Sequence, residues 1–225
     1  QVLDTLEDTD KINETAIIFC SDHGDFSGEH QMASKGGVFY DCLVRVPMLL
    51  AAPGAIEPSQ VVNSPVCLTD VIPTLFSLQN LDAPRGLDGQ PMVPCPGAEP
   101  KEYGFSLYGA GGPDVSLNEL RELDNSYGRQ ALLKTGQKRE AAGRRAMIRG
   151  QRWKYVHDSM GDLDELYDLQ VDPYEHRNLA GQPDYSQIQT KLHNDLADWR
   201  RWDKQDKKNV ATTSGANPEK GRDVN

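Results

Sequence analysis

Four residues in one short stretch have side chains whose types and spacing suit chemistry: Asp22, His23, His30 and Lys35. Asp22 can offer hard carboxylate oxygen to a divalent cation, and the adjacent His23 can offer a neutral nitrogen. Lys35 precedes two glycines and is a mobile point charge that can meet an oxyanion in the same pocket. The set favours a site in which a metal ion and an ammonium group together hold a tetrahedral anion.

Each of these residues also has an ordinary structural interpretation. An Asp-His-Gly triplet after a strand commonly forms a turn with hydrogen-bonded polar groups. His30 suits loop or helix-cap chemistry as well as contact with a substrate, and a lone lysine is commonly a solvated side chain. The chemistry is therefore a hypothesis that rests on the whole set and its order.

The elements around this stretch must bring the side chains together. Residues 15–20 form an uninterrupted apolar run rich in β-branched side chains, which predicts a strand in the middle of a parallel sheet covered on both faces. Asp22 and His23 then lie at the carboxyl end of that strand, where open α/β sheets bind ligands. Gly24 gives the backbone freedom to aim both side chains inward.

Other elements are expected before and after this strand. An amphipathic helix begins near Val2, residues 45–54 predict a second buried strand, and residues 69–78 predict a helix. Thr69 can cap this helix, and Pro73 falls in its first turn, where a missing N–H costs least. Residues 82–101 are rich in Pro and Gly, which predicts a loop that crosses the surface of the molecule.

The C-terminal part predicts a second, smaller unit. Short strands are expected at 145–149, 153–156 and 165–169, joined by turns, which indicates a small antiparallel sheet. Residues 185–202 have helical apolar spacing and predict a helix packed on this sheet. Residues 203–225 carry almost no large apolar side chains, which predicts a disordered tail.

Composition limits the classes of protein that the chain can represent. Its 225 residues correspond to about one and a half domains. The apolar fraction of 37% suffices for a core, and no apolar run reaches the ~18–20 residues that a membrane span needs. The net charge of −10 disfavours nucleic acid as a partner. The four cysteines have no metal-type spacing and say little about redox compartment.

The order and spacing of the whole set resemble the second half of the catalytic domain of the sulfatases, members of the alkaline phosphatase superfamily. The resemblance covers about residues 1–202 and is far more specific than any single motif. It is carried by Thr15–Asp25, Gly28-Glu29-His30, Ser34-Lys35-Gly36, Val44-Arg45-Val46-Pro47, Ala52-Pro53-Gly54, Thr69–Leu75, Arg152–Tyr155 and Glu165–Ala180. Choline-sulfatase-like, iduronate-sulfatase-like and phosphonate monoester hydrolase-like enzymes are similar to it.

The resemblance implies a fold and a division of the chain. The fold class is the C-terminal part of an alkaline-phosphatase-like α/β sandwich domain, followed by a small antiparallel-sheet-plus-helix subdomain. Residues 1–100 are expected to be the second half of the catalytic domain, and 101–144 an insertion or connection. The C-terminal α+β subdomain then spans 145–202, followed by the tail at 203–225.

The resemblance also implies roles for the site residues. Asp22 and His23 would ligate a divalent cation, usually Ca²⁺ in sulfatases, with Mg²⁺ or Mn²⁺ as alternatives. Lys35 would bind the sulfate ester oxygens as the catalytic cation, and His30 is a weaker candidate for substrate contact. Many sulfatases have asparagine where His23 stands, but histidine is familiar in one large branch. The expected substrate is a sulfate ester, with a sulfated carbohydrate as one candidate.

The family's nucleophile has no counterpart in this sequence. It is a formylglycine made from Cys or Ser in a C/S-x-P-x-R motif, and Cys42-Leu43-Val44-Arg45 lacks the proline. Asp22 and His23 are also too few to hold Ca²⁺, which takes six to eight oxygen ligands. We therefore expect a fragment or processed part of a longer enzyme, inactive alone, whose partner is the missing N-terminal half. Family habit implies a periplasmic, secreted or lysosomal location.

Two alternatives remain open from the sequence. One is a phosphonate monoester or phosphodiester hydrolase of the same superfamily. The other is an inactive remnant that binds anionic carbohydrate through the Arg/Lys-rich residues 119–160. The alcohol of the substrate is not identified, because specificity in such sites comes from surrounding loops.

Overall fold

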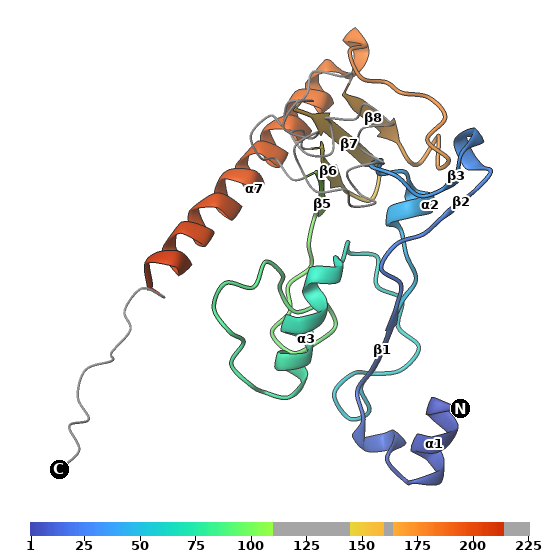
Figure 1. Ribbon diagram of the computed structural model, residues 1–225, viewed down its shortest axis with the longest axis vertical. Coiled ribbons are helices and arrows are strands. Elements are labelled where there is room, and N and C mark those ends of the chain that lie inside the picture. The colour runs from blue at the N-terminus through green and yellow to red at the C-terminus, as the bar shows by residue number, and fades with distance from the viewer. Residues whose placement is uncertain (110–144, 160–163, 214–225) are drawn as a thin grey trace, which may run out of the picture.

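A computed structural model describes residues 1–109, 145–159 and 164–213, with side chains described as far as residue 200. Figure 1 shows the helices and strands of both parts of the chain. The elements before the first gap are α1 (Val2–Asp8), β1 (Ile17–Cys20), β2 (Phe26–Ser27), β3 (Ala33–Ser34), α2 (Asp41–Val44), β4 (Met48–Ala51), α3 (Val71–Leu78) and β5 (Gly104–Tyr108). Those after it are β6 (Arg145–Arg149), β7 (Trp153–Asp158), β8 (Glu165–Asp168) and α7 (Ser186–Thr213).

The C-terminal part is a four-stranded antiparallel sheet in the order β5-β6-β7-β8. Phe105 stands opposite Ile148, and Ile148 stands opposite Tyr155. The three strands predicted from the sequence are confirmed as β6, β7 and β8. The fourth strand, β5, lies within residues 101–144, which were expected to be an insertion or connection. The sheet therefore begins at Gly104, before the predicted boundary at 145.

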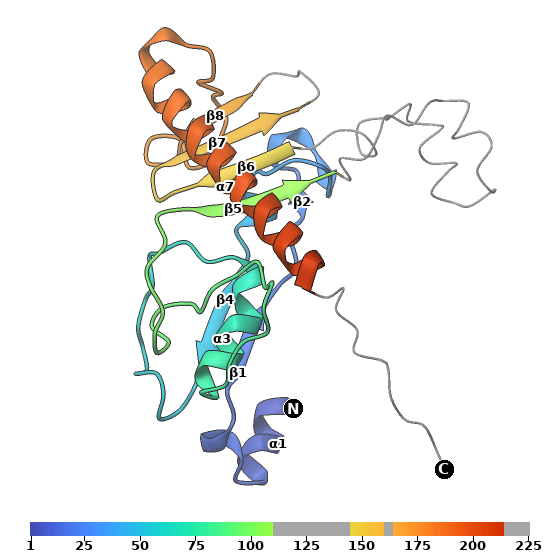
Figure 2. The same cartoon turned by 90° about the vertical axis from the view of Figure 1, so that its left-hand side faces the viewer.

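Helix α7 covers one face of this sheet (Figure 2). Leu192 and Leu196 are almost fully buried against Ile148 and Tyr155, as their helical spacing predicts. Burying a leucine side chain stabilises a fold by about 1.5–3 kcal/mol, so this stripe fixes the helix on the sheet. The helix continues past its predicted end at Trp202 as far as Thr213. The expectation of a disordered tail does not fit residues 203–213, and residues 214–225 lie outside the described residues.

The opposite face of the sheet packs against the chain that leads into α2. Met147 and Val156 point to this face because side chains alternate along a strand, and they form one buried cluster with Phe39. This packing joins the small sheet to the segment that follows Lys35. The two predicted units thus share a core layer.

β1 and β4 form a separate two-stranded antiparallel sheet, with Phe19 opposite Leu49. The strand predicted at 15–20 is present, but within the described residues it has one antiparallel neighbour and not the expected parallel ones. Its apolar side chains are incompletely covered: Phe19 is 58% exposed and Leu49 65%. Both strands have the apolar composition that is typical of buried strands, but their residues are half-buried or exposed.

α3 starts after a 3-10 turn at Leu68–Asp70, and Pro73 lies in its first turn as predicted. Thr69 does not cap this helix. The buried carboxylate of Asp70 accepts the backbone N–H of Cys67 at 2.7 Å and binds Lys101 Nζ. The crossing at 82–101 is anchored to the same turn, because the backbone N–H of Gln90 donates to Asp70 Oδ1.

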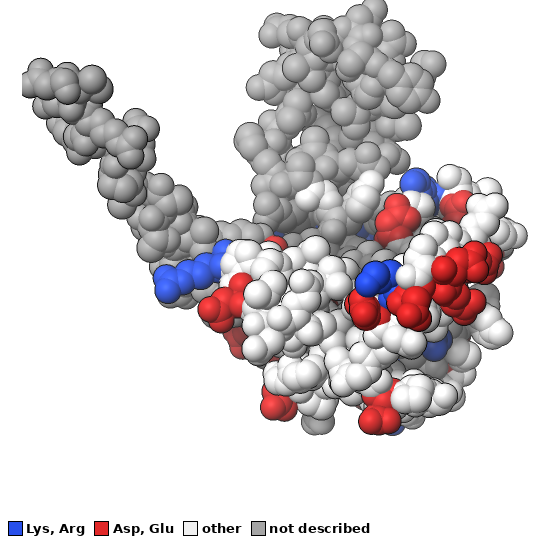
Figure 3. Space-filling view, turned by 90° about the horizontal axis from the view of Figure 1, so that it is seen from below, with Lys and Arg blue, Asp and Glu red and all other residues white. Residues whose placement is uncertain are grey.

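Acidic side chains exceed basic ones on the face seen from below, beside a broad uncharged area (Figure 3). Within the described part of the chain, no helix combines the length and the apolar character needed to cross a membrane. The four cysteines are free thiols.

Candidate functional site

The strand-end turn after β1 is held against α2 by Gly24. The backbone N–H of Gly24 donates to the carbonyl oxygen of Leu43 at 2.8 Å. A Cβ atom at position 24 would lie 1.9 Å from the carbonyl oxygen of Cys42, which no side chain can tolerate. Only glycine fits this contact, and the contact sets the position of the adjacent His23.

The ring of His23 is oriented by its two nitrogens. Nδ1 lies 2.6 Å from the carbonyl oxygen of Gly24, which only accepts, so Nδ1 carries the proton. Nε2 therefore presents a lone pair, and the ammonium group of Lys35 donates to it at 2.7 Å. A backbone carbonyl that fixes the tautomer is the usual support of a metal-binding histidine. The arrangement therefore suits a ligand as well as a hydrogen bond.

Asp22 completes the cluster from its other side. Its Oδ2 lies 3.6 Å from His23 Nε2, and its side chain is 85% exposed. The backbone N–H of His23 donates to Oδ1 at 3.0 Å and lowers the pKa of Asp22, and the positive charge of Lys35 lowers it further. An ionised carboxylate and an imidazole lone pair thus lie together. The structure brings Asp22, His23 and Lys35 into one site, as the sequence predicts.

The donors of this cluster fit a divalent cation in kind but not in number. One carboxylate and one imidazole nitrogen are suitable ligands for a borderline or hard dication, yet Mg²⁺ and Ca²⁺ take about six to eight ligands. The ammonium group of Lys35 occupies the lone pair that a metal would use. A cation at this site therefore needs further ligands, and Lys35 must move away from His23. The backbone freedom of Gly36 and Gly37, which follow Lys35, allows this movement.

His30 packs among aromatic side chains. Its backbone has a φ of 51°, and its ring stacks on Tyr40 with centroids 3.7 Å apart. His176 approaches the same ring at 5.5 Å. The role of His30 in substrate contact stays a prediction, since the structure places its ring among aromatic neighbours.

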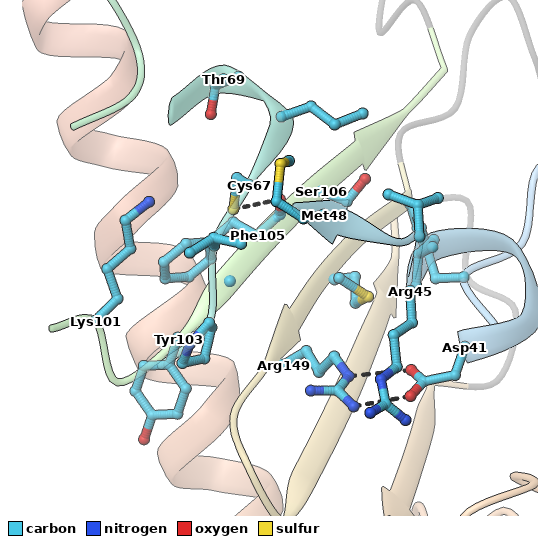
Figure 4. Close-up of a pocket in the computed structure, with 18 of the residues that line it drawn as sticks. Asp41, Arg45, Met48, Cys67, Thr69, Lys101, Tyr103, Phe105, Ser106 and Arg149 are labelled. Carbon is cyan, nitrogen blue, oxygen red and sulfur yellow. Dashed lines mark hydrogen bonds and ion pairs between the residues drawn. The ribbon is translucent and has the colours of Figure 1, made fainter. Parts of the chain in front are cut away.

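A groove extends from the cluster between α2, β4 and the edge of the C-terminal sheet (Figure 4). Arg149 on β6 points across this groove to Asp41 on α2, with bonds of 2.8 Å and 3.0 Å to the carboxylate. Arg45 is exposed in the same groove, whereas Lys101 pairs with the buried Asp70. Sequence reasoning missed Arg149 because its position beside α2 depends on the pairing of distant segments.

A buried ion network ties α2 to the C-terminal part. Lys154 is fully buried and donates to Asp41 Oδ1 and to Glu175 Oε1, each at 2.5 Å, and to the carbonyl oxygen of Phe39 at 2.9 Å. Glu175 also accepts the backbone N–H of Asp41 at 2.5 Å. Burial raises the pKa of Asp41, but bonds from Arg149 and Lys154 outweigh it, so this pKa is lowered overall. The network holds the segment between Lys35 and Arg45.

One sequence hypothesis concerns residues that are mostly not described. Most of the Arg/Lys-rich region at 119–160 lies outside the described residues. The remnant hypothesis, which relied on that region for carbohydrate binding, therefore stays a hypothesis.

Comparison with known proteins identifies the family. Residues 1–81 match the family Sulfatase, and residues 134–202 match the family N-sulphoglucosamine sulphohydrolase, C-terminal. A Delta 4,5-hexuronate-2-O-sulfatase of Bacteroides thetaiotaomicron is 30% identical over 189 residues, which cover 83% of this chain and 35% of that protein.

Solved structures show the same likeness in three dimensions. A 2-O GAG sulfatase superposes with a TM-score of 0.70 at 27% identity, covering 92% of this chain and 41% of that one. The phosphonate monoester hydrolase of Agrobacterium radiobacter superposes with a TM-score of 0.68 at 30% identity, covering 90% and 38%.

These likenesses and the strand-end site define the class of protein: the C-terminal part of an alkaline-phosphatase-like α/β fold. The chain belongs to the sulfatase family. It spans about a third of the length of the curated relatives that it matches.

Proposed function

We propose that this chain is part of a metal-dependent sulfuric ester hydrolase that cleaves a sulfate monoester. In this proposal Asp22 and His23 hold the metal and Lys35 binds the sulfate oxygens, while the nucleophile comes from outside this chain. The observation that carries it is the convergence of these three side chains, with Lys35 Nζ 2.7 Å from His23 Nε2 and Asp22 Oδ2 3.6 Å from the same nitrogen.

In this proposal, each of the three side chains contributes a different kind of group to the site. A divalent cation, when bound, supplies Lewis-acid stabilisation of charge on the sulfate oxygens. Asp22 contributes an ionised carboxylate, and His23 contributes a lone pair whose direction Gly24 fixes. Lys35 brings a positive charge beside the same point and can move from His23 to an anion. Such preorganised charge stabilises a transition state more than a flexible group in water can.

The substrate class follows from the relatives and stays a proposal. A hexuronate-2-O-sulfatase and a 2-O GAG sulfatase are among the similar proteins. We propose that the alcohol is a carbohydrate, bound along the groove that contains Arg45 and leads away from Lys35.

The test is turnover of an aryl sulfate by the full-length enzyme that carries this chain. Lys35→Ala should lower kcat/KM by on the order of 100-fold or more, because it removes a charge that faces the reacting sulfate. Lys11→Ala is the matched control, since Lys11 is an exposed lysine that pairs with the exposed Glu14. Turnover of Lys35→Ala equal to that of the control would refute the assignment.

The same superfamily offers phosphonate or phosphate diester hydrolysis as a second function. The likeness to the phosphonate monoester hydrolase at 30% identity is the observation that favours it. The wild-type enzyme should turn over an aryl sulfate faster than the matching aryl phosphonate. The reverse order would assign the chain to the second function, with Asp22, His23 and Lys35 in the same roles.

A further inference from the structure

A second cluster of metal-ligating side chains lies in the C-terminal part, away from Asp22 and Lys35. It consists of His157 on β7, Asp164 just before β8 and His193 on α7. Each offers one ligand atom, and these atoms all lie within 4.8 Å of one another. None of the three lines the groove that contains the first site.

Tyr155 sets the protonation of this cluster. Its hydroxyl donates to Asp164 Oδ2, because a carboxylate only accepts, and its oxygen also lies 3.0 Å from His193 Nδ1. The hydroxyl has one proton, so His193 Nδ1–H donates to it and the other ring nitrogen keeps a lone pair. His157 Nδ1 likewise lies 3.0 Å from Asp164 Oδ1. Each imidazole can therefore keep one nitrogen whose lone pair is available to a metal ion.

The packing supports a fixed and accessible set of donors. Tyr155 is fully buried in the core, with its ring 6.0 Å from that of His193. The rings of His157 and His193 lie 5.1 Å apart and nearly perpendicular. His157 is 30% exposed and Asp164 24%, so an ion from solvent can reach them. Three donors from three elements leave coordination positions for water.

The donor set selects the kind of ion. Two imidazole nitrogens and one carboxylate oxygen suit zinc and other first-row transition dications. Ca²⁺ and Mg²⁺ favour all-oxygen sites, so they fit less well. One carboxylate and two neutral imidazoles also leave a net charge of −1 to meet the cation.

We propose that His157, Asp164 and His193 bind a first-row transition dication, with Zn²⁺ as the best match, and that this ion fastens α7 to the sheet. The site is independent of the proposed hydrolase function. It would join the end of β7, the start of β8 and the helix at one point.

The experiment uses the untagged, chelator-treated full-length enzyme that carries this chain, with Asp22→Ala and His23→Ala, which remove the first candidate site. Calorimetric titration with ZnCl₂ should give one ion per chain, and Co²⁺ should give a visible spectrum typical of low coordination number. Adding Asp164→Asn should raise the Zn²⁺ dissociation constant at least about tenfold, since it removes the anionic ligand but keeps an acceptor for Tyr155. His176→Gln, a histidine outside the cluster, is the matched control and should leave affinity unchanged.

Stability provides the second measurement. Saturating Zn²⁺ should raise the Tm of the background protein, because an ion that binds only the folded state stabilises it. The increase should disappear in His193→Gln and in His157→Gln, whose metal-free circular dichroism verifies folding. The proposal is overturned if the background protein binds no Zn²⁺ at millimolar concentration, or if Asp164→Asn binds it as tightly as its parent.

Discussion

At the scale of single residues, the proton on His23 determines what the site can hold. Because Nδ1–H is committed to the carbonyl oxygen of Gly24, Nε2 is the atom that faces both Lys35 and Asp22. Lys35 and a metal ion compete for that lone pair. Binding of an anion to Lys35 would relieve the competition, so metal and substrate should favour each other's binding.

Metal content tests the two proposed ligands. Asp22→Ala and His23→Ala should each lower the divalent metal retained by the full-length enzyme, because each removes one donor. Metal affinity should also fall in acid, since an imidazole must be neutral to ligate. The measurement is metal content by atomic emission after dialysis at a series of pH values. Asp25→Ala is a matched control, and equal metal content in all three variants would exclude Asp22 and His23 as ligands.

The convergence of Asp22, His23 and Lys35 could be predicted from the sequence because all three follow a strand end within a short stretch. The position of His30 could not. Positive φ angles at Gly28, His30 and Gln31 turn the chain, and the His30 ring stacks on Tyr40. That turn depends on local backbone conformations that residue types alone do not specify.

At the scale of elements, strands with a clear apolar pattern were predictable and long-range partners were not. β6, β7 and β8 are confirmed, since each has several apolar side chains between turn residues. β5 is only five residues long, begins with glycine and pairs with a strand far along the chain. The contact of Lys154 with Asp41 and Glu175 joins three distant segments. No local pattern predicts that a lysine in a strand is fully buried.

The buried network should dominate the stability of this region. Lys154→Met leaves the buried Glu175 and the partly buried Asp41 without their shared cation, so the free energy of unfolding should fall by about 3–5 kcal/mol. Adding Glu175→Gln removes one of those charges and should restore part of the loss. Urea unfolding of the wild type, both single variants and the double variant measures the coupling. Strictly additive losses would show that Lys154 and Glu175 do not interact.

The loss in Lys154→Met should also depend on pH. Burial already raises the pKa of Glu175, against the pull of Lys154, and removing the lysine raises it further. A raised folded-state pKa means that protonation stabilises the fold, and this contribution is lost as pH rises through that pKa. The difference from wild type should therefore shrink as pH falls from 7 towards 5.

At the scale of the whole molecule, the described residues leave the apolar sheet of β1 and β4 incompletely covered. Phe19 and Leu49 stand opposite each other and are both largely exposed. Val2 and Leu3 on α1 are 77% and 52% exposed. Exposed apolar strands with unpaired edges promote association. We infer that this sheet packs against further residues of a longer protein, since the chain spans about a third of the length of its curated relatives.

The chain on its own should therefore self-associate through this sheet. Leu49→Lys should lower the apparent mass measured by light scattering at ~10 μM chain, because a charge on a strand blocks pairing and apolar contact. Val171→Lys is the matched control, since Val171 is 76% exposed but lies beyond β8. A monomeric wild-type chain, or an equal effect of both substitutions, would contradict the inference.

The close approach of Gly24 to Cys42 has a consequence for how the site tolerates change. The turn that holds His23 cannot move unless α2 moves with it, and α2 is tied through Asp41 to Lys154 on the C-terminal sheet. The position of the turn that carries Asp22 and His23 thus depends on a subdomain that contributes neither of these side chains nor Lys35. Destabilising substitutions in that sheet should therefore misalign the imidazole of His23, even in a protein that remains folded.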